Sequence, residues 1–359
     1  MNSKIIAAGV IAALIIAGAS VYFMSNNDDK GWYAWDPTVG EVDYTKITAT
    51  PQIIDSIEEM YQTVYGELPS TSGVVVPEDE KLVYESLVTD TAGGIQVRSV
   101  MSATSGNDQH TGSVYFTDEE IENMKIISYS SGVTDSYVEM LGTDNVWNTV
   151  VAAGNSTWKN YADNDMENWS TSATGTLGSE YTISTENLLS YLNYANADTN
   201  GEHYCVVVWG YITDYDKICN DLSDAGYSNV DILCIDYYSI TSFEYLLSVV
   251  DALGQIVGIE PEENVSIDDF QLRLYVMMNA LESNTDEHTV YLERADRKSP
   301  GADTLAQLCF DVLKLENINT VTSTTMVSDE IVLIEKPDVI FFTKGDTRTM
   351  DEKMRVTTV

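Results

Sequence analysis

The stretch that decides the fold runs from His203 to Ile235 and reads HYCVVVWGYITDYDKICNDLSDAGYSNVDILCI. Its first part, Cys205 to Trp209, is continuously apolar and predicts a buried strand. The amphipathic part from Asp214 to Ala225 predicts a helix that Gly226 ends. A second apolar strand is predicted from Val230 to Ile235. Strand, helix and strand in this order favour a parallel sheet covered by helices.

The same alternation continues on both sides of this stretch. Upstream, we predict strands at Met124–Ser128 and Val146–Ala152 and helices at Thr134–Leu141 and Ser184–Tyr194, with Ser184 as the N-cap of the last helix. Downstream lies a helical block without strands from Ser242 to Leu281, broken at Gly258–Glu263. Strands at Thr289–Glu293 and Asp338–Phe342 and a helix at Ala302–Leu315 then resume the alternation.

We therefore predict an α/β protein with two Rossmann-like lobes joined by a long inter-lobe helix. The N-lobe is assigned to residues 124–240, the inter-lobe helical segment to 241–283 and an apparently short C-lobe to 284–359. Residues 31–123 form an upstream region of unknown role. Within that region we predict a helix from Ile53 to Tyr65 and strands at Gly94–Met101 and Ser113–Thr117.

Composition and charge narrow the choice of partners. The chain has 359 residues, of which 44% are hydrophobic and 21% charged, so it can form two domains with apolar cores. Acidic residues outnumber basic ones 57 to 18, giving a net charge of −39. Such a charge repels nucleic acid and anionic lipid head groups, which excludes both as partners. The charge itself is interpreted as a solvated surface.

Residues 1–30 carry an export signal. Lys4 precedes an apolar run from Ile5 to Met24, and polar residues follow it. A run of about 20 residues can cross a bilayer as one helix, so we predict a transmembrane anchor that places the rest of the chain outside the cell. The alternative is a signal peptide cleaved at the small residues Ala17–Ala19, which would release a secreted protein.

The sequence gives little support to catalysis or to a resident metal. None of the hydrolase, metalloprotease, P-loop or dinucleotide motifs stands between a predicted strand and helix, so no enzyme and no cofactor is predicted. The three histidines are too few for a zinc or manganese site. Two of them, His203 and His288, precede their strands, at the edge opposite to the one where ligands bind.

Four cysteines remain, and none forms a CxxC pair. A disulfide is possible outside the cell, but four cysteines allow three pairings and the spacing does not choose among them. Burial as small core residues is the competing interpretation.

Five segments in order between residues 124 and 345 resemble one family, the substrate-binding proteins of iron-complex and cobalamin ABC transporters. The segments are Lys125–Asn145, Thr182–Trp209, Thr241–Gly258, Thr289–Leu313 and Glu330–Phe342. The resemblance implies two lobes that capture a ferric siderophore, haem or a corrinoid between them and deliver it to an ABC permease. The family's second lobe normally continues for several more elements, and the upstream region is a candidate to complete it.

The rule for open parallel sheets selects the candidate ligand residues without the resemblance, because ligands bind beyond the carboxyl ends of the strands. Arginine suits carboxylates and phosphates, and aromatic rings offer stacking area, so this set suits a bulky anionic chelate. The predicted ligand-binding residues are Tyr129, Ser130, Ser131, Trp209, Tyr211, Tyr237, Tyr238, Arg294, Arg297 and Lys298.

Two other functions stay open at this point. One is a metal-chelatase-like enzyme on a related two-lobed fold, which a catalytic histidine near the ligand would favour. The other is a surface protein that has kept the fold and lost transport, which the short second lobe favours. A core explanation for the tyrosines and ion pairing of the arginines with neighbouring acids also compete with the ligand roles.

Overall fold

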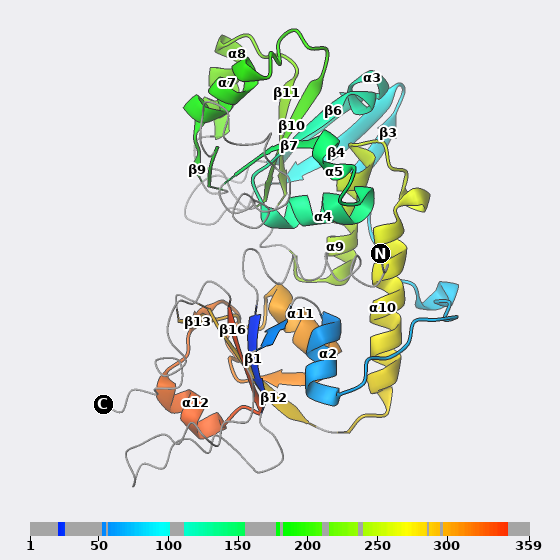
Figure 1. Ribbon diagram of the computed structural model, residues 1–359, viewed down its shortest axis with the longest axis vertical. Coiled ribbons are helices and arrows are strands. Elements are labelled where there is room, and N and C mark those ends of the chain that lie inside the picture. The colour runs from blue at the N-terminus through cyan, green and yellow to red at the C-terminus, as the bar shows by residue number, and fades with distance from the viewer. Residues whose placement is uncertain are drawn as a thin grey trace. The chain divides into compact units, whose positions relative to one another are not determined.

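The computed structural model describes residues 21–25, 52–54, 57–100, 111–154, 177–179, 182–209, 215–235, 240–285, 287–294 and 297–343. These residues form two compact units. The first contains residues 82–270, and the second contains 271–343 together with the described residues between 21 and 81 (Figure 1). The division falls within the long helix α10 (Val265–Glu282).

The first unit is built on a four-stranded parallel sheet in the order β11-β10-β6-β7. Its strands are β6 (Met124–Ser128), β7 (Val150–Ala153), β10 (His203–Trp209) and β11 (Val230–Ile235). The central strand β10 pairs with β6 on one side and β11 on the other, so that Val206 lies opposite Ile127 and Ile232. Because both faces of this sheet are covered, its strands are apolar throughout rather than alternating.

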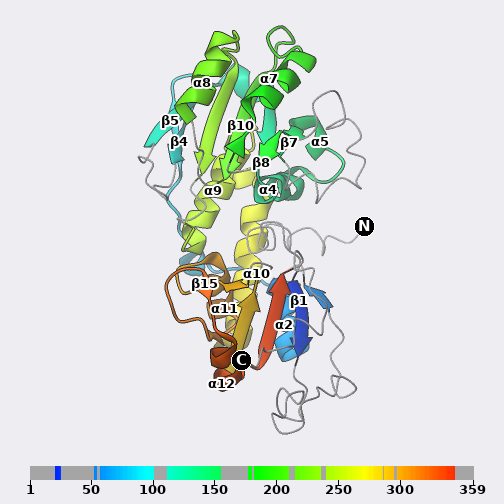
Figure 2. The same ribbon diagram turned by 90° about the vertical axis from the view of Figure 1, so that its left-hand side faces the viewer.

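Helices α7 (Thr185–Tyr194) and α8 (Tyr215–Asp224) cover one face of this sheet (Figure 2). Their buried residues Leu188, Leu192, Ile218 and Leu222 pack in one cluster with the strands. The Ser184 hydroxyl accepts a hydrogen bond from the Asn187 N–H at 3.3 Å, which confirms the predicted N-cap.

Helix α4 (Ser131–Leu141) contacts both β6 and helix α9 (Phe243–Gln255). One predicted strand was too long: residues Val146–Thr149 form a short helix, α5, and only then does β7 begin. The reason is local, because the Val146 N–H bonds the Gly142 carbonyl at 3.1 Å and so prolongs the helical turn after α4.

Part of the upstream region belongs to the first unit. Strands β3 (Val88–Thr91), β4 (Gly94–Val100) and β5 (Thr111–Thr117) form an antiparallel sheet, followed by helix α3 (Asp118–Glu122). The Cys234 N–H donates to the Ser99 hydroxyl at 3.0 Å, so β4 lies against the edge strand β11. This small sheet therefore covers an edge that would otherwise expose unpaired backbone groups.

The second unit has a five-stranded sheet in the order β14-β12-β16-β1-β2. Its strands are β12 (His288–Glu293), β14 (Leu315–Asn317), β16 (Val339–Thr343), β1 (Val21–Ser25) and β2 (Gln52–Ile54). Strand β12 runs parallel to β14 and β16, whereas β1 runs antiparallel to β16 and β2. Segments far apart in the sequence thus share one sheet.

Two predictions for the N-terminal part need correction. Val21–Met24, assigned to the anchor helix, form most of β1, where β-branched and aromatic residues are favourable; residues 5–20 lie outside the described part of the chain. Ile53 and Ile54, predicted in a helix, belong to β2, and the helix α2 begins at Ile57. Among the described residues no helix is long and apolar enough to cross a membrane.

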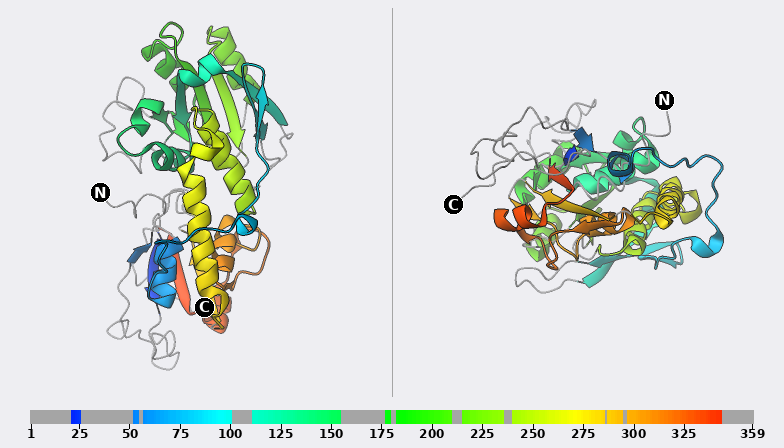
Figure 3. Two further views of the ribbon diagram at one scale, coloured as in Figure 1. Left: turned by 90° about the vertical axis from the view of Figure 1, so that its right-hand side faces the viewer. Right: turned by 90° about the horizontal axis from the view of Figure 1, so that it is seen from below.

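Helix α2 (Ile57–Tyr65) packs beside the second-unit part of α10 (Figure 3). Glu58 pairs with Arg273 of α10, and both side chains are largely buried. The Tyr65 hydroxyl donates to the Leu313 carbonyl. The upstream region is therefore divided between the two units and does not form a domain of its own.

Two further helices complete the second unit, α11 (Leu305–Val312) and α12 (Asp329–Glu335). The helix predicted at Ala302–Leu315 is shorter at both ends. Thr304 caps its start by accepting from the Gln307 N–H, and Lys314 has a positive φ of 50°, which ends the helical path before Leu315 begins β14.

Candidate functional site

The first candidate edge lies where the parallel strands of the first unit end. Trp209, the last residue of β10, pairs with Ile235, the last residue of β11. Both strands therefore end at the same level, and the segments that follow leave the sheet at one edge. Tyr211, Tyr237 and Tyr238 belong to those segments and lie outside the described residues, as does the Trp209 side chain.

Tyr129 follows β6 at this edge, but its side chain is turned into the core. It has no exposed surface, packs in the cluster with α7 and α8, and donates its hydroxyl to the Leu177 carbonyl at 3.0 Å. Burial raises the pKa of this phenol far above its usual range. In this structure Tyr129 holds the segment at Leu177 rather than presenting its ring at the edge.

Ser130 and Ser131 form the turn from β6 into α4. Ser130 is the N-cap residue and is buried, yet its side chain makes no capping hydrogen bond. The turn is held from below, because the Thr134 hydroxyl donates to Ser128 Oγ at 2.8 Å and the Ser128 hydroxyl donates to the Ser130 carbonyl at 2.8 Å. Ser131 begins the helix, and its side chain is not among those described.

Asp135 is a residue of this edge that the sequence did not single out. It stands one turn after Ser131 on α4 and is partly buried. Burial raises the pKa of its carboxyl to about 8, so the group is mostly uncharged at neutral pH. Its only sequence signal is a single acid between apolar residues of a helix, which carries little information in a chain with 57 acids.

The second candidate edge is a tight turn after β12. The Arg294 N–H donates to the Lys298 carbonyl and the Arg297 N–H to the Arg294 carbonyl, each at 2.8 Å. Arg297 adopts a positive φ of 64°, and its Nη2 lies 3.2 Å from Asp329 Oδ1 at the start of α12. The structure thus brings three exposed cations together on one turn of five residues, Arg294, Arg297 and Lys298.

Buried polar groups fix this turn from the inside. The Asn319 side chain donates to the Ser299 carbonyl at 2.7 Å, and Asn317 donates to the Pro300 carbonyl at 3.0 Å. Beside them the Tyr291 hydroxyl donates to Glu293 Oε2 at 2.8 Å, and both side chains are buried. Burial, followed by the nearby Glu293 charge, raises the pKa of Tyr291. The sequence gave no reason to select these positioning residues.

Ser299 adds one unsatisfied group to this layer. It lies in β13 (Lys298–Ser299), which pairs with β15 (Thr325–Met326), and it has no exposed surface. Its hydroxyl has no hydrogen-bond partner within the described part of the chain. Such a group costs free energy, which makes this turn a specialised rather than an arbitrary piece of surface.

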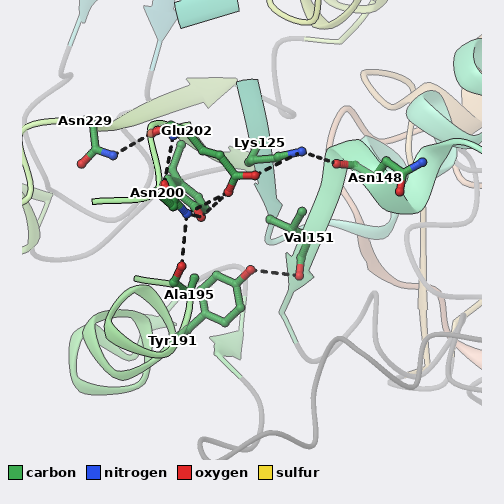
Figure 4. Close-up of polar contacts among 9 residues, drawn as sticks. Lys125, Asn148, Val151, Tyr191, Ala195, Asn200, Glu202 and Asn229 are labelled. Atoms are coloured by element: carbon green, nitrogen blue, oxygen red, sulfur yellow. Dashed lines mark hydrogen bonds and ion pairs between the residues drawn. The ribbon is translucent and has the colours of Figure 1, made fainter. Parts of the chain in front are cut away.

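The opposite edge of the first-unit sheet is occupied by its own side chains (Figure 4). The Tyr204 hydroxyl donates to Glu202 Oε2 at 2.7 Å, and Lys125 Nζ lies 3.5 Å from Glu202 Oε1. Lys125 also donates to the Asn148 carbonyl at 2.8 Å. These groups satisfy one another, so this edge is a structural closure.

The two described histidines lie at strand starts, as predicted. His203 opens β10, with its Nε2 2.9 Å from Asp231 Oδ2 and its Nδ1 3.4 Å from Glu120 Oε1, and His288 opens β12. His110 falls outside the described residues. In the residues that the structure describes, no three His, Cys, Asp or Glu side chains converge in a way that suits a metal ion.

No protein-family model matches the chain, and neither does any curated protein. Among solved structures, the chain is similar to a periplasmic haem-binding protein from Pseudomonas aeruginosa, with a TM-score of 0.45 and 15% identity over 60% of this chain and 69% of that one. It is also similar to a periplasmic solute-binding protein from Veillonella parvula, with a TM-score of 0.45 and 18% identity over 68% and 67% of the two chains.

A third similar structure is a periplasmic vitamin B12-binding protein from Vibrio cholerae, with a TM-score of 0.42 and 16% identity over 61% of this chain and 76% of that one. All three are solute-binding proteins, the class that the sequence resembles. At these scores and identities the likeness does not extend to what this chain binds.

Proposed function

We propose that this chain is an extracellular solute-binding protein of an ABC uptake system, which captures an anionic metal chelate and delivers it to a permease. Ferric siderophores, haem and corrinoids are the ligand classes that fit. The support comes from two α/β units with parallel strands, from candidate residues at strand ends, and from the family resemblance of the sequence. No catalytic step is part of this proposal.

The observation that carries the proposal is the cationic turn at Arg294, Arg297 and Lys298. The chain has only 18 basic residues against 57 acids, yet three of the basic ones share this turn. Asn317 and Asn319 fix the backbone beside it, so the turn is preorganised. Guanidinium groups bind carboxylate and phosphate oxygens in pairs, which suits the periphery of an anionic chelate.

The first unit is proposed to add polar and aromatic contacts. Ser130 and Ser131 begin α4 at the ligand edge, where backbone N–H groups favour negatively charged atoms. Trp209, Tyr211, Tyr237 and Tyr238 would supply flat surfaces for a macrocycle or an aromatic chelator. Tyr129 is assigned to the core instead, because its hydroxyl already bonds Leu177.

Export is proposed to depend on residues 5–20. Strand β1 begins at Val21, so sixteen residues of the apolar run precede it. As a helix they would measure about 24 Å, less than the roughly 30 Å of a bilayer core. This length supports the alternative of a signal peptide cleaved near Ala17–Ala19, and the mass of the exported protein distinguishes the two.

The experiment is thermal unfolding of the chain from Ser20 to Val359, which retains β1, against ferric siderophores, haem, cobalamin and free divalent metals. A ligand that binds only the folded state raises the melting temperature; at 100 times its Kd the stabilisation is about 2.7 kcal/mol. We expect one chelate to do so, and the double substitution Arg294→Ala with Arg297→Ala to abolish the shift.

A matched control removes two cations elsewhere, Arg98→Ala with Lys217→Ala, both exposed in the first unit. If the control loses the shift equally, net charge rather than the turn is responsible. If no compound raises the melting temperature, the proposal is wrong and a surface role gains weight. The observation favouring that role is the antiparallel sheet β3-β4-β5, which extends the first unit with a further exposed face.

A further inference from the structure

The structure separates the four cysteines into different surroundings. Cys309 lies in α11 of the second unit, and the other three lie in the first unit, Cys205 in β10, Cys219 in α8 and Cys234 in β11. All four are free thiols in this structure. The three pairings allowed by the sequence can therefore be compared by position.

Only two of the thiols share one face of the sheet. Cys234 belongs to the core cluster between the sheet and helices α7 and α8, and Cys219 packs against that same cluster from α8. Cys205 does not, because its neighbours in β10, Tyr204 and Val206, point into the cluster and side chains alternate along a strand.

The ionisation of these groups shows that Cys219 and Cys234 are neighbours. Burial, opposed by a hydrogen bond from Ser99, raises the pKa of Cys234 to about 12, and the Cys219 thiol adds to this rise. The Tyr215 hydroxyl hydrogen-bonds Cys219, and both thiols in turn raise the pKa of Tyr215. Such effects extend over only a few ångströms.

We propose that Cys219 and Cys234 form a disulfide that ties helix α8 to strand β11 in the exported protein. Cys219 is the half-exposed member, so its thiolate attacks a sulfur of an external disulfide oxidant and releases one thiol. The Cys234 thiolate then attacks the Cys219 sulfur and releases the second thiol. Two protein thiols lose two electrons and two protons, and the oxidant disulfide is reduced to two thiols.

The disulfide would act on the candidate ligand edge. Cys234 is the penultimate residue of β11, directly before the segment with Tyr237 and Tyr238, and Cys219 lies one turn into α8, which follows Tyr211. The bridge would close the chain between positions 219 and 234 and fix one end of each segment. A restricted loop stabilises the folded state by limiting the unfolded one. The consequence for ligand binding, and the oxidising location, rest on the proposed function.

The test treats the folded chain with glutathione disulfide, blocks remaining thiols with iodoacetamide in denaturant, and maps the peptides. We expect a mass lower by about 2 Da, a linked peptide pair containing Cys219 and Cys234, and alkylated Cys205 and Cys309. The oxidised form should melt several degrees higher than the reduced form.

Cys219→Ser should lose both the linked peptides and the difference in melting temperature, whereas the control Cys309→Ala should keep both. Four alkylated cysteines after oxidation of the folded and of the refolding chain would overturn the proposal, as would a bridge involving Cys205. No ligand enters this test, so its failure would leave the proposed function standing, and failure of the ligand panel would leave the thiol map unchanged.

Discussion

The two units form their sheets from the chain in opposite ways. In the first unit, all four strands of the parallel sheet lie between residues 124 and 235, and each pairs with a neighbour reached through a nearby crossover. In the second, β1 and β2 come from the first 54 residues and join strands that begin at His288. A contiguous sheet is visible in the sequence, whereas a sheet assembled from distant segments is not.

The difference also concerns how each unit is held together. The first unit has a single large apolar cluster with fully buried strands. The second relies on long-range contacts between α2 and the later chain, such as Glu58 with Arg273 and Tyr65 with Leu313. Closing such long loops costs chain entropy before any contact forms. We therefore expect the second unit to be the first to unfold.

The largest expected effect comes from emptying each core separately. Leu188→Ala removes a fully buried side chain from the first unit, and Phe341→Ala removes one that stacks on Phe310 in the second, with ring centroids 6.3 Å apart. Each should cost about 3–5 kcal/mol. Calorimetry should show each substitution lowering a different transition; one transition that responds equally to both would contradict independent units.

The next effect tests the long-range contacts of the second unit. Glu58→Ala leaves Arg273 largely buried without this partner and should cost about 2 kcal/mol. Hydrogen exchange should rise in α2 and the neighbouring part of α10 and leave β10 protected. The control is Asp221→Ala, which breaks the exposed pair with Lys217 and should cost no more than about 0.5 kcal/mol. Equal effects of the two substitutions would refute the difference between the units.

Asp135→Asn should stabilise the first unit in a pH-dependent way. The carboxyl has a folded pKa of about 8, above its unfolded value of 3.8, so the folded state holds the proton more tightly and wild-type stability falls as pH rises between these values. Asparagine removes this dependence. Its advantage in urea unfolding should be near zero at pH 4 and reach about 1–2 kcal/mol at pH 8. A constant advantage across this range would rule out burial of the charge as the cause.

The smallest effect separates two buried tyrosines of the first unit. Tyr129→Phe removes a hydrogen bond to Leu177 and should cost about 1 kcal/mol. Tyr137→Phe removes a buried hydroxyl that has no partner within the described residues, so it should be neutral or slightly stabilising. Chemical denaturation of the two variants provides the measurement. A cost for Tyr137→Phe as large as that of Tyr129→Phe would imply that its hydroxyl has a partner.

The sequence predicted the local elements of the first unit well. Hydrophobic runs located β6, β10 and β11, and the helix over α8 ends as the glycine at position 226 suggested, with a φ of 89°. These features depend on neighbouring residues alone. The start of β7 was misplaced because the apolar residues after Val146 fit a strand and a short helix equally, and the Gly142 carbonyl decides between them.

The candidate ligand residues were predicted only in part. The structure places Arg294, Arg297 and Lys298 on one turn, and whether they bind a chelate stays a prediction. For Tyr129 the rule of strand ends gave the correct edge but not the direction of the side chain, which the core around Leu177 sets. Asp135, Asn317 and Asn319 carried no pattern to select them, because single polar residues acquire meaning only from their surroundings.

By itself the sequence determined that the chain forms α/β units, where most of its strands and helices lie, and that its charge excludes nucleic acid. Those properties follow from local periodicity, composition and net charge. Only the tertiary structure decided that the N-terminal strands complete the second sheet, that α2 pairs with Arg273, and that Cys219 faces Cys234. Pairing between distant segments depends on which surfaces exclude water together, and that free energy belongs to the folded chain as a whole.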